Sequence, residues 1–146
     1  LDDDRALPIL YENSSYGKPE MVRAQAMRTL GKMGKSRPND GEILEKIGDA
    51  FRSPPGPRSF RAKLAAIQAL ETLNREEGIP MLRRVAETEL DGRLVRNARL
   101  AARKIEKGKD KGEAIQKLEK RLDEFAEENK KLKDRLDRLE MKASKD

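Results

Sequence analysis

The 146-residue sequence contains no cysteine, no histidine and no tryptophan. The first two absences exclude a thiol nucleophile, an imidazole base, disulfide bridges and the usual zinc ligands together. Aromatic residues make up only 3% of the chain, so side chains that could stack on bases or fill a cofactor pocket are scarce. We therefore expect no catalytic site, no metal site and no cofactor in this chain.

Long apolar runs are also missing, and none approaches the ~18 residues that a membrane-spanning helix needs. The start of the sequence, Leu1 followed by residues 2–4, is acidic, whereas a signal peptide begins with basic residues. We expect a soluble, cytoplasmic protein with no membrane partner. Because residue 1 is leucine and not methionine, we also expect the chain to be a fragment of a longer protein.

Charged residues are abundant at 41%, a composition that indicates disorder unless the apolar residues are periodic. They are periodic: Val22, Ala26, Leu30 and Met33 follow one another at helical spacing. The pattern predicts an all-α fold. Proline and glycine clusters divide the first part of the chain into six expected helices, at 4–13, 19–34, 41–52, 58–73, 77–89 and 91–107.

The first part of the chain repeats itself. The segment Ala6–Leu10 reads like Gly78–Leu82, with Pro8 and Pro80 in register at an offset of 72 residues. A third unit lies between them at an offset of 40, which places residue 66 on residue 26. Repeats of this length, each made of two helices, are typical of helical solenoids.

Residues 22–34, with Val22-Arg23, Leu30-Gly31 and a final Met-Gly, resemble the second helix of a HEAT repeat. Residues 60–70 are similar, except that their aromatic-Arg pair is shifted by two residues. The resemblance covers residues 4–107 and implies a short HEAT-like α-α solenoid of about three helix pairs; an irregular helical bundle is the alternative. The order of loops and alanines also resembles the helical C-terminal domain of bacterial gluzincin aminopeptidases. Their zinc motif H-E-x-x-H is absent, so this resemblance implies an accessory domain only.

The apolar period changes after residues 108–112, which we interpret as a charged hinge because they include two glycines. From there, apolar residues recur every three and four positions with a strict period of seven. The sequence predicts a 1–107 repeat domain, a coiled-coil helix over 113–142 and a disordered tail over 143–146. The predicted a and d positions of the coiled-coil interface are Ile115, Leu118, Leu122, Phe125, Asn129, Leu132, Leu136 and Leu139.

Asn129 occupies an a position, where a buried amide favours pairing with its own counterpart across the interface. This pairing selects a parallel, in-register homodimer. The flanking charges agree, since Glu128 faces Lys133 and Arg135 faces Glu140 between parallel helices. Antiparallel or higher-order association, and a seam completed within the chain or by a different protein, remain open alternatives.

The net charge is +6, of which +5 falls on residues 1–108. The helix expected at 91–107 carries the candidate basic residues Arg93, Arg96, Arg99, Arg103 and Lys104. Helical spacing places the second to fourth of these on one face, where they could follow a phosphate backbone. Curved HEAT-like surfaces serve that purpose in alkylation-repair glycosylases, which this chain resembles in architecture alone. The scarcity of aromatic residues favours the alternative of an ordinary solvated face.

Taken together, these features predict a non-catalytic protein–protein interaction or scaffold module that has protein partners and dimerises through its coiled coil. It is expected to be a fragment or an accessory C-terminal domain of a larger protein, with a zinc aminopeptidase as one candidate. Nucleic-acid binding through the basic repeat face is the alternative function.

Overall fold

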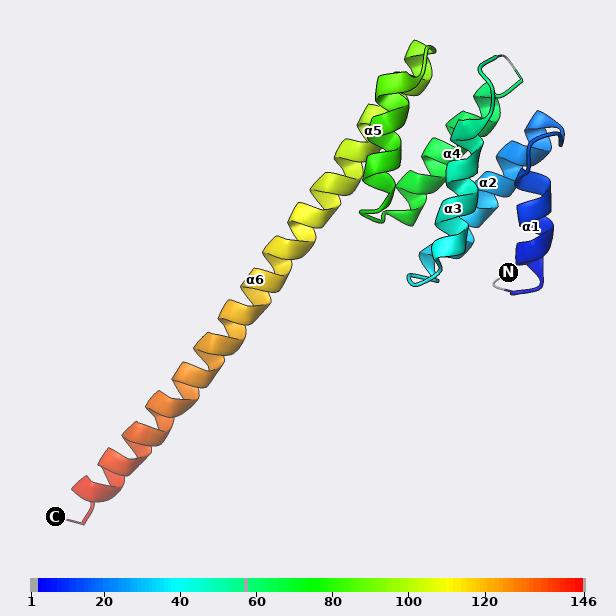
Figure 1. Cartoon of the computed structure of the whole chain (residues 1–146). Coiled ribbons are helices and arrows are strands. Elements are labelled where there is room, and N and C mark those ends of the chain that lie inside the picture. Colours follow the sequence, from blue (N-terminus) through cyan, green and yellow to red (C-terminus); the bar gives the residue numbers. More distant parts are fainter. Residues whose placement is uncertain (1–2, 57, 146) are drawn as a thin grey trace. The chain divides into compact units, whose positions relative to one another are not determined.

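A computed structural model describes residues 3–56 and 58–145. These residues form six α-helices and one short 3₁₀ helix, with no strand among them (Figure 1). The prediction of an all-α fold is therefore confirmed. The elements are α1 (Ala6–Ser14), α2 (Glu20–Lys35), α3 (Gly41–Asp49), η1 (Ala50–Arg52), α4 (Phe60–Leu73), α5 (Gly78–Thr88) and α6 (Gly92–Ala143).

The helix boundaries follow local chemistry. Pro8 and Pro80 lie in the first turns of α1 and α5, where a missing N–H leaves no helical hydrogen bond unmade. Asp40 caps α3, because its carboxylate accepts hydrogen bonds from the backbone N–H groups of Glu42 and Ile43 at 3.1 and 3.3 Å. Asn74 ends α4 in the left-handed conformation, with φ at 52°.

The chain divides into two compact units, the first ending at Gly108 and the second beginning at Lys109. Residues 108–112, which we predicted as a hinge, are helical, and α6 passes through them without a break. Each glycine costs a helix about 1 kcal/mol relative to alanine, and two glycines among good helix formers do not end it. The helix also continues to Ala143, where a tail was expected, and a turn at 144–145 follows; Asp146 lies outside the described residues.

The first unit is built in two layers. Helices α1, α3 and α5 lie in front of α2, α4 and the beginning of α6 (Figure 1). Both layers contribute to one hydrophobic core, which also includes the Ala-rich face of α4 and the first turns of α6. Its largest fully buried side chains are Met27, Leu30, Ile43, Ile47, Ile67, Leu70, Leu82, Leu94 and Ile105.

Helices α2 and α4 pack side by side through small residues. Gly31 faces Ala69 so closely that a Cβ on residue 31 would lie 2.8 Å from the Cα of Ala69. Only a glycine fits at this crossing without a shift of the α4 backbone. Alanines at 62, 65, 66 and 69 are at most 1% exposed, which lets α4 approach its neighbours closely.

Two basic side chains are buried within this unit. The guanidinium of Arg23 donates to the carbonyl oxygen of Ser14 at 3.3 Å and to the hydroxyl oxygen of Ser53 at 2.8 Å. Burial lowers the pKa of Arg23, since the charged form loses hydration. Lys63 pairs with Glu89 at 2.7 Å, and only 4% of its side chain is exposed. Both cations connect a helix of the rear layer to the end of a helix in the front layer.

Arg75, which follows α4, holds the connection between α2 and α3. Its guanidinium donates to the carbonyl oxygens of Gly34 at 2.7 Å and Asp40 at 2.8 Å, and also to that of Arg37. One side chain therefore binds three carbonyl groups of the 34–40 segment, and those of Gly34 and Arg37 also accept hydrogen bonds from the backbone of the same segment.

Candidate functional site

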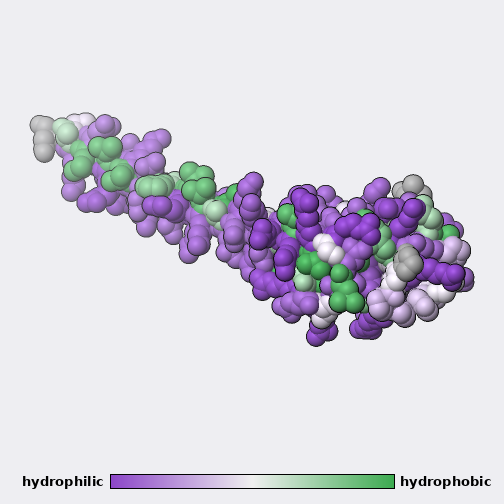
Figure 2. Space-filling view, turned by 90° about the horizontal axis from the view of Figure 1, so that it is seen from above, coloured by the Kyte–Doolittle hydropathy of each residue, from purple (hydrophilic) through white to green (hydrophobic). Residues whose placement is uncertain are grey.

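The second unit carries an apolar stripe on one helix, which only Asn129 interrupts. Every apolar a and d residue predicted there is between 56% and 67% exposed, from Ile115 to Leu139, and Asn129 between them is exposed as well. Figure 2 shows these green side chains following the helix between purple, hydrophilic ones. A long row of exposed leucine and phenylalanine side chains is a candidate interaction surface, whereas single exposed ones need no explanation.

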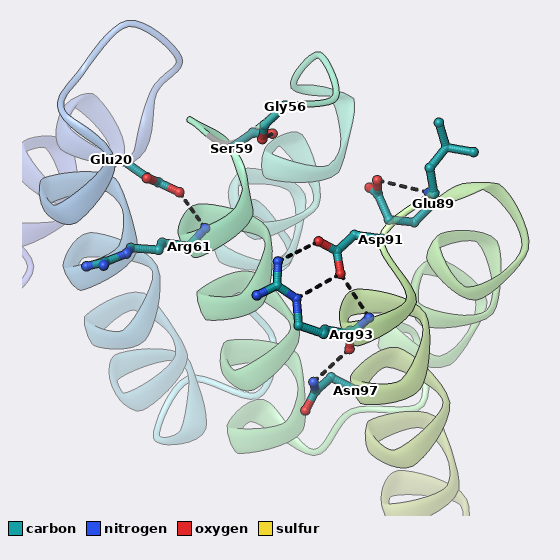
Figure 3. A network of polar contacts seen from close by, with 9 residues as sticks. Glu20, Gly56, Ser59, Arg61, Glu89, Asp91, Arg93 and Asn97 are labelled. Atoms are coloured by element: carbon teal, nitrogen blue, oxygen red, sulfur yellow. Dashed lines mark hydrogen bonds and ion pairs between the residues drawn. The ribbon is translucent and has the colours of Figure 1, made fainter.

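The predicted basic residues divide into two groups. Arg93 pairs with Asp91 at 2.8 Å (Figure 3). Its guanidinium carbon also lies 4.0 Å from the ring centroid of Phe60. Hydrogen bonds from Arg93 lower the pKa of the Asp91 carboxyl to about 2. Lys104 pairs with Glu71. These two cations are therefore already engaged by carboxylates of their own unit.

The other three candidates, Arg96, Arg99 and Arg103, are exposed. They lie on the side of α6 opposite its buried residues, which include Leu94 and Ala98. Within the described part of the chain, no ion pair joins any of the three to a carboxylate. The structure thus brings three of the five predicted basic residues together on one outer surface.

Two grooves escaped the sequence analysis, because each is formed by residues from two helices. One lies between α3 and α5, has a volume of about 420 Å³, and combines Phe51, Met81 and Val85 with charged residues at its rim. The other lies between α1 and α2 and has a volume of about 350 Å³. Its lining residues are Leu10, Asn13, Met21, Val22, Gln25, Ala26 and Thr29.

Neither groove has lining residues of the kind that form a catalytic site. Over residues 3–56 and 58–145, no group of three or more acidic, cysteine or histidine side chains is arranged to hold a metal ion. The same residues include no helix that is both long and apolar enough to cross a membrane.

Comparison with protein-family models, with curated proteins and with solved structures finds no significant match to this chain. The class that the fold and its surfaces define is therefore an all-helical protein with an exposed heptad stripe.

Proposed function

We propose that this chain is a non-catalytic protein–protein interaction module that dimerises through its C-terminal helix as a parallel coiled coil. The observation that carries the proposal is the exposed stripe, in which seven of the eight a and d positions between Ile115 and Leu139 are large and apolar. Burying such a side chain contributes about 1.5–3 kcal/mol, and a second copy of the same helix offers a matching seam.

The width of the stripe supports a helical partner. A helix that packs against a globular core presents a wider apolar face, whereas a narrow seam of period 3.5 is suited to a supercoiled helix. Asn129 and the charged pairs between Glu128 and Lys133 and between Arg135 and Glu140 all favour the parallel, in-register arrangement. Each pair contributes only tenths of a kcal/mol, so the pairs select orientation more than they add affinity.

For the first unit we propose a HEAT-like stack of three helix pairs, α1–α2, α3–α4 and the pair that α5 makes with the beginning of α6. The two-layer order of these helices and the close contact between Gly31 and Ala69 support this assignment. Such a unit serves to present a surface to a protein partner, either in an adaptor or in an accessory C-terminal domain of a larger protein such as a zinc aminopeptidase.

Nucleic-acid binding is the second candidate function, and the exposed group of Arg96, Arg99 and Arg103 favours it. Three arginines release few counterions, and aromatic residues make up only 3% of the chain. We therefore expect any such binding to be weak and strongly salt-dependent.

Sedimentation equilibrium of the full chain tests the proposed dimer. We expect a dimer, a monomer for Leu122→Lys, and no change for the control Lys120→Ala, which lies at the outward f position. Asn129→Ile should raise the melting temperature of the coil and broaden its oligomer distribution, because the restriction to one register is lost. A monomeric parent chain at high micromolar concentration would contradict the proposal.

Disulfide cross-linking tests whether the two helices of the dimer are parallel. The chain has no native cysteine, so only the introduced one can react. A single cysteine introduced as Leu136→Cys lies opposite its counterpart in a parallel, in-register dimer and should oxidise readily to a disulfide. In an antiparallel dimer the two sulfurs are far apart. Failure to cross-link in a confirmed dimer would exclude the parallel arrangement.

A further inference from the structure

The groove between α1 and α2 lies at the position where each later helix pair meets the pair before it. At the 40-residue offset, Val22, Gln25, Ala26 and Thr29 correspond to the alanines at 62, 65, 66 and 69 of α4. Those alanines are at most 1% exposed, in the helix that packs along α2. In α2 the equivalent surface is only partly covered: Ala26 is 3% exposed and Thr29 is half-buried, but Gln25 is exposed, Val22 is 40% exposed and the neighbouring Met21 58%.

The third helix pair repeats the relation. At the 72-residue offset, Leu94, Ala98 and Ala101 of α6 correspond to Val22, Ala26 and Thr29, and they are at most 2% exposed, whereas Asn97, which corresponds to Gln25, is exposed. The first surface is thus the least covered of the three, since the position of Val22 is buried in both later pairs.

The N-terminus of α4 shows the same difference from that of α2, while the backbone N–H of Arg93 in α6 donates to Asp91 of its own loop. In α4, the backbone N–H of Arg61 donates to the carboxylate of Glu20, which reaches across from α2 (Figure 3). Met21 is the residue equivalent to Arg61, and the start of α2 has no side-chain cap. The surface of α2 therefore lacks both the apolar cover and the carboxylate that α4 receives from its neighbour.

The opposite end of the first unit, formed by the beginning of α6, has a polar outer surface. The outer side of α6 carries Arg96, Arg99 and Arg103, and a polar outer face is typical of the terminal repeat of a stack. A second copy joined head to tail would place these arginines against the apolar groove, at a large desolvation cost. The open surface therefore suits a partner whose contacting face lacks such a group of arginines.

We infer that the groove between α1 and α2 is a docking site for a further helix pair of the same construction, stacked before α1. Its rear helix carries a carboxylate in the first turn, which reaches the N–H of Met21, as Glu20 reaches that of Arg61. The same helix has a glycine or alanine opposite Thr29, as Gly31 lies opposite Ala69. This inference deepens the interaction role proposed for the first unit and is independent of the coiled coil.

The probe is a second copy of residues 3–40 fused before residue 3 of the full chain, since α2 itself has the required glycine and carboxylate. A single cysteine, Thr29→Cys in the original copy, is labelled with a maleimide. The labelling rate measures whether the fused helix pair covers the groove at residue 29. We expect this rate to fall at least tenfold in the fusion. The control Thr72→Cys, on an exposed position of α4, should react at the same rate with and without the fused copy.

Gly31→Leu in the fused copy alone should restore fast labelling of residue 29, because the added helix can no longer approach. Circular dichroism checks that the fused copy adds helix. Unchanged labelling in the fusion, or protection that survives the leucine, would overturn the inference. In the unfused chain, protection of residue 29 that increases with protein concentration would also overturn the inference, because the occupant would then be a second copy. All labelling is done in the Leu122→Lys background, so that dimerisation through the tail does not contribute to the protection.

Discussion

The two units of this chain are both helical and both rich in charge, yet they treat their apolar residues in opposite ways. In the first unit, Leu30, Ile43, Ile47 and Leu70 are fully buried, whereas Leu118 of the second unit is 61% exposed. Helical content alone therefore does not show whether a unit buries its apolar side chains within the chain. The difference lies in which residues accompany the leucines.

Small residues allow the first unit to bury most of its apolar side chains. Gly31 and the alanines of α4 let several short helices approach one another and share one core, whereas Met21 and Val22 at the first helix pair stay exposed. In the second unit the apolar stripe is narrow, and long charged side chains flank it on both sides. A stripe of this kind is buried only by another helix with a similar seam.

Removal of residues 109–146 should have the largest effect, because it leaves only the unit whose apolar residues are mostly buried. We expect all self-association to disappear, because the exposed stripe is gone, while the first unit keeps its helical content and cooperative unfolding. Sedimentation and thermal melting followed by circular dichroism measure the two effects. An insoluble or molten remainder would mean that the tail belongs to the core of the first unit.

Alanine substitutions of one glycine in each unit should have opposite signs. Gly31→Ala places a methyl group against the Ala69 backbone and should reduce the free energy of unfolding by about 2–3 kcal/mol. Gly112→Ala meets nothing within 4 Å and should strengthen the tail helix by up to about 1 kcal/mol. Urea denaturation of the first unit and thermal melting of the tail check the pair. A neutral Gly31→Ala would show that α2 and α4 are not in close contact.

Alkaline pH should destabilise the first unit, through Tyr11. Burial, together with the nearby carboxylates of Asp40 and Glu42, raises the pKa of its hydroxyl from 10.0 to about 12. Between these values the unfolded chain releases the proton and the folded chain keeps it, so stability is complete below pH 10 and falls as the pH approaches 12. We expect a loss of about 1–2 kcal/mol.

Urea denaturation at intervals of half a pH unit measures this loss, and Tyr11→Phe should remove it. The second unit contains no tyrosine, so the melting of the tail should lack this contribution. An unchanged pH dependence in the phenylalanine variant would assign the alkaline transition to other groups.

The smallest expected effect concerns the basic face. Replacing Arg96, Arg99 and Arg103 with glutamate should reduce duplex DNA binding, which we expect to be weak at low salt and lost near physiological salt. Titration of a labelled duplex at both salt concentrations checks this. Sub-micromolar binding that persists at physiological salt and is lost in the variant would favour nucleic-acid binding over the proposed interaction role.

Much of the helical structure could be predicted from the sequence. Helix α2 was expected at 19–34 and is found at Glu20–Lys35, and α4 was expected at 58–73 and is found at Phe60–Leu73. Proline and glycine next to periodic apolar residues fix these limits locally. The hinge expected at 108–112 coincides with the boundary between the two units at Gly108, but the backbone there is helical, since two isolated glycines without proline do not stop a helix.

Burial of charged residues was beyond the reach of the sequence. The spacing of Arg23 and Lys63 gives no sign that one reaches Ser53 and the other Glu89, 30 and 26 residues away. The groove between α1 and α2 was missed as well, although the repeat that we propose to explain it was predicted from the sequence. Comparing the exposure of equivalent positions requires coordinates, and periodicity alone assigns all three helices the same apolar face.

The contact of Arg75 with the 34–40 segment has a consequence for how this chain can change over time. Three carbonyl groups that converge on one guanidinium fix the length of that connection, because an inserted or deleted residue would move at least one of them out of reach. The loop joins α2 to α3 whereas the arginine follows α4, so the loop cannot change without affecting a residue far along the chain. Among diverging sequences, a change in the length of the 34–40 segment should accompany the loss of the basic side chain at position 75.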